Sequence, residues 1–435
     1  IKASRVDTGA SESHAFPAGT AVVSTRQPLG GLMNTLLEKA PAFSKGFVEE
    51  QRAKAEADEP DEFYDLTTWS LPLAMNVEAW VTTAPVAGTS EYRATDPAAF
   101  RAASYGYLVD ALEPNLYRFA GRLIGSKINF SVSDAPIDSG TQTFARGSMV
   151  ILKGNNAKDV DATLANIARD TRVNVVPLET GWIGGTALGS EKIHHIKDPK
   201  IGLVGGAGSS ASSFGMLWHT LDVDTPIPHT TLSAESLRNV DLHDYEVLIF
   251  PDGSFADRLG KRGVDKIKAW VNDGGTIVAV KGANAFLREK DVEISKLKRW
   301  EPPKKKDDDK TSGDERYNDY RIPGSAFRTT MNERSYLTFG VPRSPAVLVE
   351  GSNAFLPVAH TVDNILTIEA KDPLISGVAW EESLERIKGA VYVVSEPFGR
   401  GQVITFADDP NYRLFWRGTL PIFLNAVLYS PSFPR

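Results

Sequence analysis

The sequence predicts an α/β protein whose second half is a doubly wound parallel sheet with helices on both faces. Three apolar runs support this prediction, at residues 200–205, 245–250 and 276–280. They are apolar at consecutive positions rather than alternate ones, which is typical of strands buried on both faces. Helix-like segments at residues 212–221 and 263–274 separate them. The order strand, helix, strand, helix, strand is that of a parallel sheet with crossover helices.

Residues 1–197 are expected to form a first α/β region of loosely repeated strand-helix units. The units begin with strands expected at residues 19–28, 104–110 and 147–153. In the third unit, Val160, Leu164 and Ile167 fall on one stripe of the following helix. The units resemble one another too weakly to indicate a solenoid.

Three segments of this first region have a different character. Residues 44–62 are rich in Glu, Lys and Ala and are expected to form a solvated helix. Residues 63–75 carry aromatic and apolar side chains around Trp69, and packing into the core is favoured over a ligand-facing loop. Residues 181–199 are glycine-rich and are expected to link the two domains.

Residues 198–435 are expected to form the second domain, which a charged stretch near residues 288–320 interrupts. Such a run is normally a solvated surface insertion. Further on, two apolar runs at residues 390–395 and 401–407 flank a glycine turn and predict a β-hairpin. Residues 418–428 are expected to close the domain with a helix.

The composition limits the classes of function that fit. The chain has 435 residues, of which 42% are hydrophobic and 24% charged, as in an ordinary soluble globular protein of two or three domains. No apolar run reaches the length of a membrane span. A net charge of -7 and a pI of about 5.6 argue against nucleic acid or anionic lipid as a partner.

The absence of cysteine is informative. It excludes disulfides, thiolate zinc sites and cysteine nucleophiles. A cysteine-free chain of this length fits a periplasmic or secreted protein. The sequence begins with Ile1 and not Met, so we expect a processed chain or an excerpt of a longer one.

A zinc site is the first chemistry to consider. His243 and Glu246 have the H-x-x-E spacing of a carboxypeptidase-type site, with His360 as a conceivable third ligand. This spacing is common by chance, and Glu246 falls at the boundary of an expected buried strand. His194 and His195 lack carboxylates at ligand spacing. We therefore expect no metal site in this chain.

The turn after the third apolar run is a second candidate, because reactive residues of α/β folds often follow a strand there. Lys281 holds that position. It could act as a nucleophile only if burial lowered its pKa strongly. No His-Asp arrangement accompanies it, so a positional lysine at the end of a strand is favoured.

Two further stretches complete a candidate pocket at the strand ends. The turn of residues 205–210 could hold an anion with its backbone N–H groups, although a plain strand-to-helix turn is favoured. Residues 406–418 follow another strand end, where open α/β sheets place ligands, and could instead form a structural ion pair. The candidate residues are Gly206, Ser209, Ser210, Lys281, Asp409 and Arg413.

Six short segments spread over nearly the whole chain carry a family resemblance: residues 63–73, 200–204, 242–252, 270–279, 322–325 and 399–406. Together they resemble the region behind the catalytic domain in long bacterial zinc carboxypeptidases of the carboxypeptidase A type. The resemblance implies a flavodoxin-like, class I glutamine amidotransferase-like fold for the second domain. Lys281 stands where the amidotransferase cysteine would fall. The zinc ligands would belong to an upstream domain, so they are not transferred to His243 and Glu246.

The resemblance leads to one expectation about function and leaves alternatives open. We expect a non-catalytic C-terminal part of a zinc carboxypeptidase-like protein, with zinc only in an upstream peptidase domain. That domain or a peptide substrate is the expected partner. One alternative is a hydrolase with a pocket near Gly206, Lys281 and Asp409. Another is a carbohydrate-binding or oligomerisation module, and in the latter case the chain would form a homo-oligomer.

Overall fold

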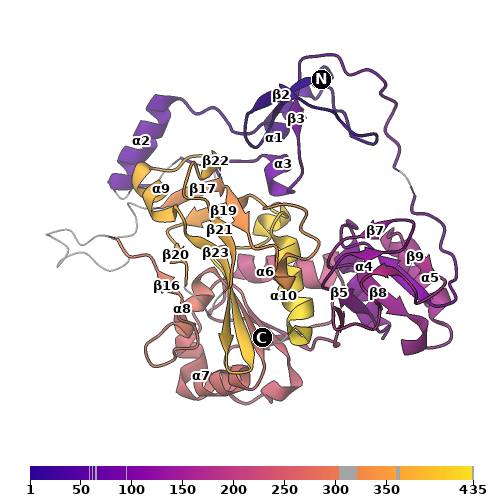
Figure 1. Cartoon of the computed structure of the whole chain (residues 1–435). Coiled ribbons are helices and arrows are strands. Elements are labelled where there is room, and N and C mark those ends of the chain that lie inside the picture. Colours follow the sequence, from indigo (N-terminus) through magenta and orange to yellow (C-terminus); the bar gives the residue numbers. More distant parts are fainter. Residues whose placement is uncertain are drawn as a thin grey trace.

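The computed structural model describes residues 1–57, 59–60, 62–63, 66–94, 96–302, 321–358 and 363–433. We call residues 1–97 the N-terminal segment, residues 98–197 the small domain and residues 198–433 the large domain. Figure 1 shows the N-terminal segment above the large domain and the small domain beside the large domain, at the right of the view.

The large domain contains a parallel sheet whose strands follow the order β13-β12-β14-β15-β24. These strands are β12 (Ile201–Gly205), β13 (Thr230–Ser233), β14 (Val247–Phe250), β15 (Thr276–Val280) and β24 (Gly401–Phe406). Numbered along the chain, the order is 2-1-3-4-5, which is the flavodoxin-like order of a doubly wound sheet. The predicted fold class of this half is therefore confirmed.

Both faces of this sheet are covered, as the consecutive apolar residues predict. On one face, Leu203 and Ile249 pack with α6 (Ala211–His219) and α10 (Leu420–Tyr429). On the other face, Leu248 and Ile277 pack with α7 (Ala256–Asn272). Strand residues that alternate between the two clusters must be apolar throughout, because neither face meets water.

An antiparallel extension continues the same sheet beyond β24. The strands of the extension are β16 (Lys298–Arg299), β18 (Thr329–Met331), β20 (Phe355–Leu356), β21 (Asp363–Ile368) and β23 (Val391–Phe398). A separate sheet in the order β19-β17-β22 contains β17 (Ile322–Phe327), β19 (Val347–Gly351) and β22 (Leu374–Ser376). The short helices are α8 (Asn284–Leu287) and α9 (Glu381–Ile387). β23 pairs with β24 as the predicted hairpin, and α10 is the predicted closing helix.

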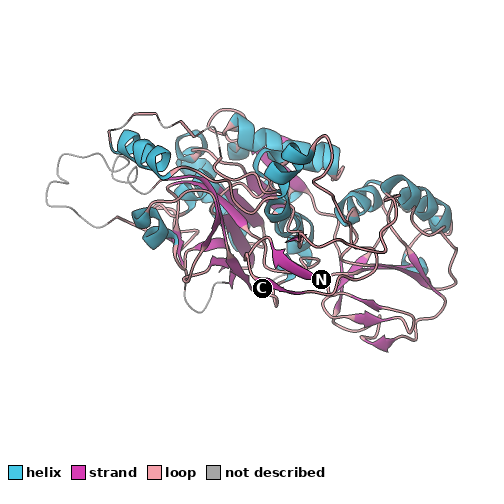
Figure 2. Cartoon of the chain, turned by 90° about the horizontal axis from the view of Figure 1, so that it is seen from above, coloured by secondary structure: helices cyan, strands magenta, loops and turns pink. Residues whose placement is uncertain are grey.

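The small domain has an antiparallel sheet in the order β11-β5-β8-β4-β9. Its elements are β4 (Gly106–Val109), α4 (Leu116–Gly125), β5 (Ser131–Ser133), β6 (Ile137–Asp138), β7 (Thr143–Phe144), β8 (Met149–Leu152), α5 (Val160–Thr171), β9 (Val176–Leu178), β10 (Gly184–Gly185) and β11 (Ile193–His195). Figure 2 shows its helices together on one side of the strands. Residues 181–199, which were predicted to be a linker, instead supply two strands. β10 pairs with β6, and β11 pairs with β5 as an edge strand of the five-stranded sheet.

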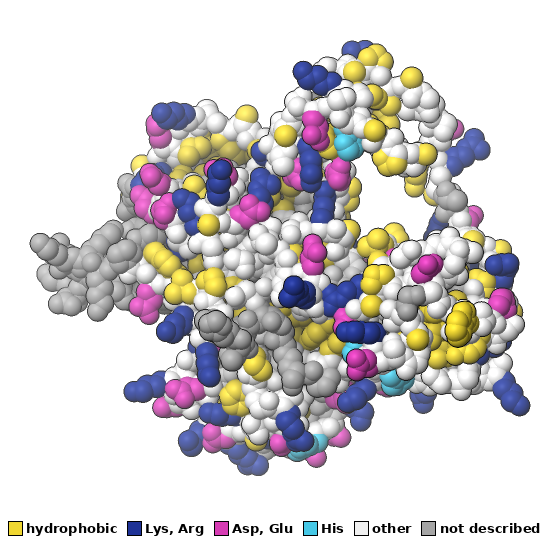
Figure 3. All heavy atoms as spheres, viewed as in Figure 1, with side chains coloured by type: hydrophobic (Ala, Val, Ile, Leu, Met, Phe, Trp, Pro, Cys, Tyr) yellow, Lys and Arg dark blue, Asp and Glu magenta, His cyan; other side chains and the backbone are white. Residues whose placement is uncertain are grey.

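The N-terminal segment buries few of its apolar side chains. It contains β1 (Lys2–Arg5), β2 (Ser11–Ser13), α1 (Gly30–Leu37), α2 (Lys45–Glu56), α3 (Leu71–Ala74) and β3 (Trp80–Val81). The strand expected at residues 19–28 is not formed, since no strand pairs with it and Val22 and Val23 stay 51% and 50% exposed. Figure 3 shows apolar side chains at the surface of this segment.

The aromatic stretch that follows α2 packs inward, as predicted. Leu66 and Leu73 are buried, and the Trp69 ring lies 5.4 Å from that of Phe415 in the large domain. Tyr64 and Asp65 of this stretch lie outside the described residues.

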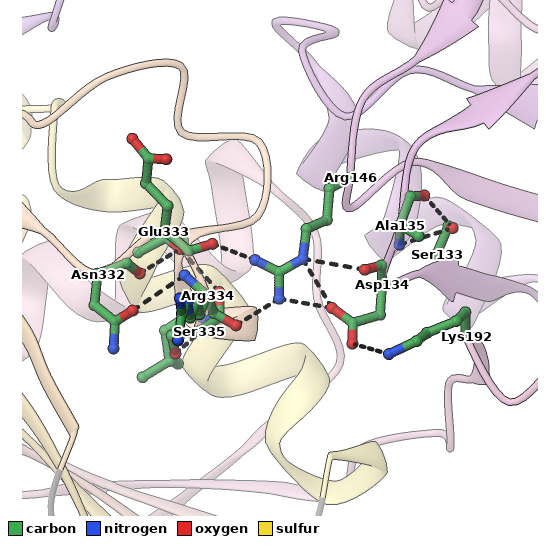
Figure 4. Close-up of polar contacts among 11 residues, drawn as sticks. Ser133, Asp134, Ala135, Arg146, Lys192, Asn332, Glu333, Arg334 and Ser335 are labelled. Carbon is green, nitrogen blue, oxygen red and sulfur yellow. Dashed lines mark hydrogen bonds and ion pairs between the residues drawn. The ribbon is translucent and has the colours of Figure 1, made fainter. Parts of the chain in front are cut away.

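The small domain is fastened to the large domain by Arg146 (Figure 4). Its guanidinium donates to the backbone carbonyls of Glu333 and Arg334 and to the Asp134 carboxylate, and it lies 4.6 Å from the centre of the Phe339 ring. Lys192 lies 3.9 Å from the same carboxylate. One apolar cluster runs through both domains, so their contact is a continuous core.

The charged insertion predicted near residues 288–320 is described only as far as residue 302, and residues 303–320 lie outside the described part. Within the described residues, no helix is both long and apolar enough to cross a membrane.

Candidate functional site

Charged side chains gather at the carboxyl end of the parallel sheet. Asp252 follows β14, Lys281 follows β15, and Asp408 and Asp409 follow β24. Glu350, near the end of β19, joins them. Open α/β sheets bind ligands at this end. We call Lys281, Glu350, Asp408 and Asp409 the lysine cluster.

Lys281 lies at the centre of the cluster. Its Nζ is 2.9 Å from Asp408 Oδ1, 3.0 Å from Glu350 Oε2 and 3.7 Å from Asp409 Oδ2. Its side chain is 15% exposed, while those of Asp408 and Asp409 are 4% and 6% exposed. One ammonium group therefore neutralises part of the charge of three carboxylates in a largely dry environment.

The backbone at Lys281 is unusual. Its φ is +52°, in the left-handed region that non-glycine residues rarely adopt. The sharp turn from β15 into the 3-10 turn Lys281–Ala283 requires this conformation, and Asn284 Nδ2 stabilises the turn by donating to the Lys281 carbonyl. Such strain often marks a functional turn.

The electrostatics keep Lys281 charged. Burial alone would lower its pKa, but attraction by Asp408, Asp409 and Glu350 outweighs burial and raises the pKa above its usual value. Burial raises the pKa of Asp408 to about 6, although Lys281 opposes that rise. Burial also raises the pKa of Asp409. An ammonium held in this way is not a nucleophile at neutral pH.

A second set of hydrogen bonds orients the acids around Lys281. Ser213, which is buried on α6, donates to Asp409 Oδ1 at 2.5 Å and accepts from the Asp252 backbone N–H at 3.1 Å. Asp252 Oδ1 in turn accepts from the Gly282 N–H at 2.9 Å. A Cβ on Gly282 would lie 2.8 Å from that oxygen, so a side chain there would displace the Asp252 carboxylate from this hydrogen bond.

The other predicted residues serve the turn before α6 and the loop after β24. Gly206 has a φ of +85°, and Ser209 Oγ donates to its carbonyl. Ser210 caps α6 by accepting from the Ser213 N–H. These roles agree with the strand-to-helix turn that the sequence favoured.

Asp409 and Arg413 are the nearest opposite charges in residues 406–418, but they do not form the structural ion pair that this stretch could have held, because Ser213 and Lys281 engage the Asp409 carboxylate. The Arg413 guanidinium lies 5.7 Å from the centre of the Tyr412 ring. Arg417, by contrast, forms an ion pair with Asp224 at 3.1 Å.

A small cavity of about 10 Å³ lies on the far side of Asp408, between β19, β23 and α9. Tyr392 lines it, and within the described part of the chain its buried hydroxyl has no hydrogen-bond partner. Burial raises the pKa of this hydroxyl. This volume is sufficient for one water molecule and no more.

Four of the residues considered for zinc, His194, His195, His243 and Glu246, lie within the described part of the chain. The His243 ring nitrogen is 3.0 Å from Asp241, and Glu246 sits at the start of β14 with its pKa raised by burial. His360 lies outside the described residues. His194 stacks near the Phe433 ring. The described residues contain no group of three or more metal-ligating side chains.

Comparisons with known proteins give matches of structure only. No family model matches the chain, and no curated protein sequence matches it. A ThuA-like protein from Parabacteroides merdae matches with 13% identity and a TM-score of 0.37 over 54% of this chain and 91% of its own. A GMP synthase subunit from Thermoplasma acidophilum matches with 8% identity and a TM-score of 0.34 over 53% and 92%.

A β-galactosidase from Bacillus circulans matches with 12% identity and a TM-score of 0.32 over 55% of this chain. The match spans 31% of the β-galactosidase chain, which is less than a third of that protein. At these identities and TM-scores the likenesses carry no argument about activity. The strand order shows that the large domain has a flavodoxin-like, doubly wound α/β fold.

Proposed function

We propose that this chain is a non-catalytic part of a zinc carboxypeptidase-like protein, in which it supports or positions the peptidase domain or binds a partner. The observation that carries the proposal is the lysine cluster. The turn after β15 is where a nucleophile would stand, and there Lys281 is bound by Asp408 and Glu350 at 2.9 and 3.0 Å.

The chemistry of the cluster supports a non-catalytic role. A lysine nucleophile must lose its proton, which requires a lowered pKa. Here the surrounding carboxylates raise the pKa of Lys281. The cluster therefore acts as a fixed ion pair that holds together the ends of β15, β19 and β24.

The carboxypeptidase part of the proposal rests on the six segments that resemble that family. Under this proposal, zinc and the peptide substrate belong to a separate peptidase domain, and the protein acts in the periplasm or outside the cell. A carboxypeptidase-type domain could use the large domain as a rigid platform, since fold and catalytic site are separable.

A hydrolase that uses the strand-end site is the second candidate. The observation that favours it is the left-handed backbone of Lys281, which resembles the strained turn of a nucleophile. The raised pKa of the same residue opposes it.

The test is an assay of the purified chain alone and together with a separately expressed carboxypeptidase A-type catalytic domain. The chain alone is expected to release no C-terminal amino acids from peptides and to hydrolyse no glutamine amide. In the mixture it is expected to form a complex or to lower the KM of the peptidase. The control is Lys153→Met, which changes an ion pair with Asp161 in the small domain. Turnover by the chain alone that Lys281→Met abolishes and Lys153→Met preserves would establish the hydrolase instead.

A further inference from the structure

Two arginines approach the turn that joins β19 to β20, which directly follows Glu350 of the lysine cluster. Arg386 lies on α9 and is 2% exposed. Its Nη2 donates to the Gly351 carbonyl over a long 3.3 Å. Its Nε and Nη1 are buried, and among the described residues neither has a hydrogen-bond partner.

This arrangement is unfavourable as it stands. A buried guanidinium normally pairs with an anion, because it has lost its hydration. Burial, with a further contribution from the charge of Arg299, lowers the pKa of Arg386 to about 10. Arg386 therefore stays protonated at neutral pH, and the nearby cation adds repulsion rather than compensation.

Further donors lie around the same turn as Arg386. Arg299, on β16, donates from Nη2 to Ser352 Oγ at 3.3 Å. The Ser352 hydroxyl accepts that bond and still has its own proton to donate. The hydrogen bond to Gly351 directs the Arg386 guanidinium toward the same turn. Two arginines and a hydroxyl beside one glycine turn form a set of donors for an acceptor that carries negative charge.

We propose that Arg386, Arg299 and Ser352 form a binding site for a compact oxyanion, namely a phosphate or carboxylate group. Nε–H and Nη1–H point to different edges of the guanidinium, and each of these edges also carries one Nη2 hydrogen. Because only one Nη2 hydrogen bonds Gly351, the other edge offers two parallel N–H donors, which is the bidentate geometry that such groups prefer. Gly351 and Ser352 are partly exposed, so a ligand approaches Arg386 from the side of this turn, and the φ of +86° at Gly351 is one that glycine adopts without strain. The site does not depend on the function proposed above.

The test is thermal unfolding of the whole chain in sodium phosphate and in sodium acetate, each compared with sodium chloride at equal ionic strength. A saturating oxyanion is expected to raise the Tm by about 3 °C. Arg386→Met is expected to abolish the rise. Arg328→Met is the matched control, because Arg328 lies in the same domain and is engaged by Glu369, and it is expected to keep the rise. Phosphate alone or acetate alone as the active ion identifies the ligand class.

An equal rise in the wild-type chain and in Arg386→Met overturns the proposal, as does the absence of any rise in the wild type. Ser352→Ala covers the case in which Arg386→Met does not fold. It retains both arginines and is expected to weaken the affinity for the active ion about five-fold, the effect of one lost hydrogen bond. An unchanged affinity in Ser352→Ala removes the hydroxyl from the site and contradicts the three-residue arrangement.

Discussion

The two domains place a lysine–carboxylate pair in opposite environments. In the large domain, Lys281 and Asp408 are 15% and 4% exposed, and burial raises the pKa of the acid to about 6. In the small domain, Lys153 Nζ lies 2.6 Å from Asp161 Oδ2, and the two side chains are 29% and 27% exposed. There burial is outweighed by hydrogen bonds from Lys153 and Tyr107, so the pKa of Asp161 is lowered. A lysine–carboxylate pair therefore carries a desolvation cost in the large domain, whereas the pair in the small domain stabilises the fold.

Depth, and not the ion pair itself, therefore decides what a charged cluster contributes. Water still reaches the Lys153–Asp161 pair and screens it. The lysine cluster lies where parallel strands end between covering elements, so its acids stay desolvated. Such an arrangement is retained for geometry or function rather than for stability.

The largest effect is expected for Lys281→Met. This change leaves Asp408, Asp409 and Glu350 buried without their cation, and it should destabilise the fold by about 3–5 kcal/mol at pH 8. Urea unfolding measures the loss. Lys153→Met is the control in the small domain and should cost about 1 kcal/mol. Equal losses in the two variants would mean that depth does not separate the two pairs.

The pH dependence should carry opposite signs in the two domains. The folded-state pKa of Asp408 is raised from 3.8 to about 6, so its contribution to stability falls as pH rises through that window. Asp408→Asn should remove a fall on the order of 2 kcal/mol between pH 4 and 6. The pKa of Asp161 is lowered, so its contribution is present above 3.8 and is lost as pH falls through the folded value.

Unfolding free energies of Asp408→Asn and Asp161→Asn, measured across pH 2.5 to 8, test both signs. Asp161→Asn should flatten only the acid end of the profile. A wild-type profile that rises between pH 4 and 6, and that Asp408→Asn leaves unchanged, contradicts the assignment of the raised pKa to Asp408.

Arg146→Ala tests whether the two domains behave as one unit. It removes the charged donor to the carbonyls of Glu333 and Arg334, so it should cost about 2 kcal/mol. Hydrogen exchange should quicken in residues 332–335. Arg169→Ala, at a side chain 72% exposed on the small domain, should change stability by less than about 0.5 kcal/mol. If exchange at 332–335 does not respond, Arg146 is not what fixes that turn.

The smallest effect is expected for Tyr107→Phe in the small domain. Tyr107 Oη donates to Asp161 Oδ1 at 2.5 Å, so its loss should cost about 1 kcal/mol and should raise the pKa of Asp161. NMR titration of the Asp161 carboxyl measures that pKa. A pKa that stays in place would show that Lys153 alone stabilises the charge.

Much of the large domain could be predicted from the sequence, because its strands are apolar at every position. Residues such as Leu248 and Ile249 face opposite clusters, and no other common arrangement requires that pattern. In the five-stranded sheet of the small domain the strands are three or four residues long, which is too short to show whether they alternate. Their antiparallel pairing therefore could not be predicted from the pattern.

The candidate site was predictable in part. Lys281 and Asp409 follow strands, so their place at the edge of the sheet could be inferred. Asp252 and Asp408 follow strands too and could have been found by the same rule. Glu350 is 69 positions from Lys281, and Ser213 is 196 positions from Asp409, and nothing local links either residue to the cluster. Long-range pairing of this kind is fixed by the fold and not by sequence spacing.

The helix α10 has a consequence for how the protein is made. All of its residues except Pro421 are buried. The Asn425 side chain donates hydrogen bonds to the carbonyls of Leu337 and Phe339, and it accepts one from the Tyr117 hydroxyl of the small domain. While these ten residues are still inside the ribosomal exit tunnel, the apolar face of the sheet that α10 covers is exposed. Synthesis therefore creates an interval in which a chaperone has a target, and the interval ends when this helix emerges.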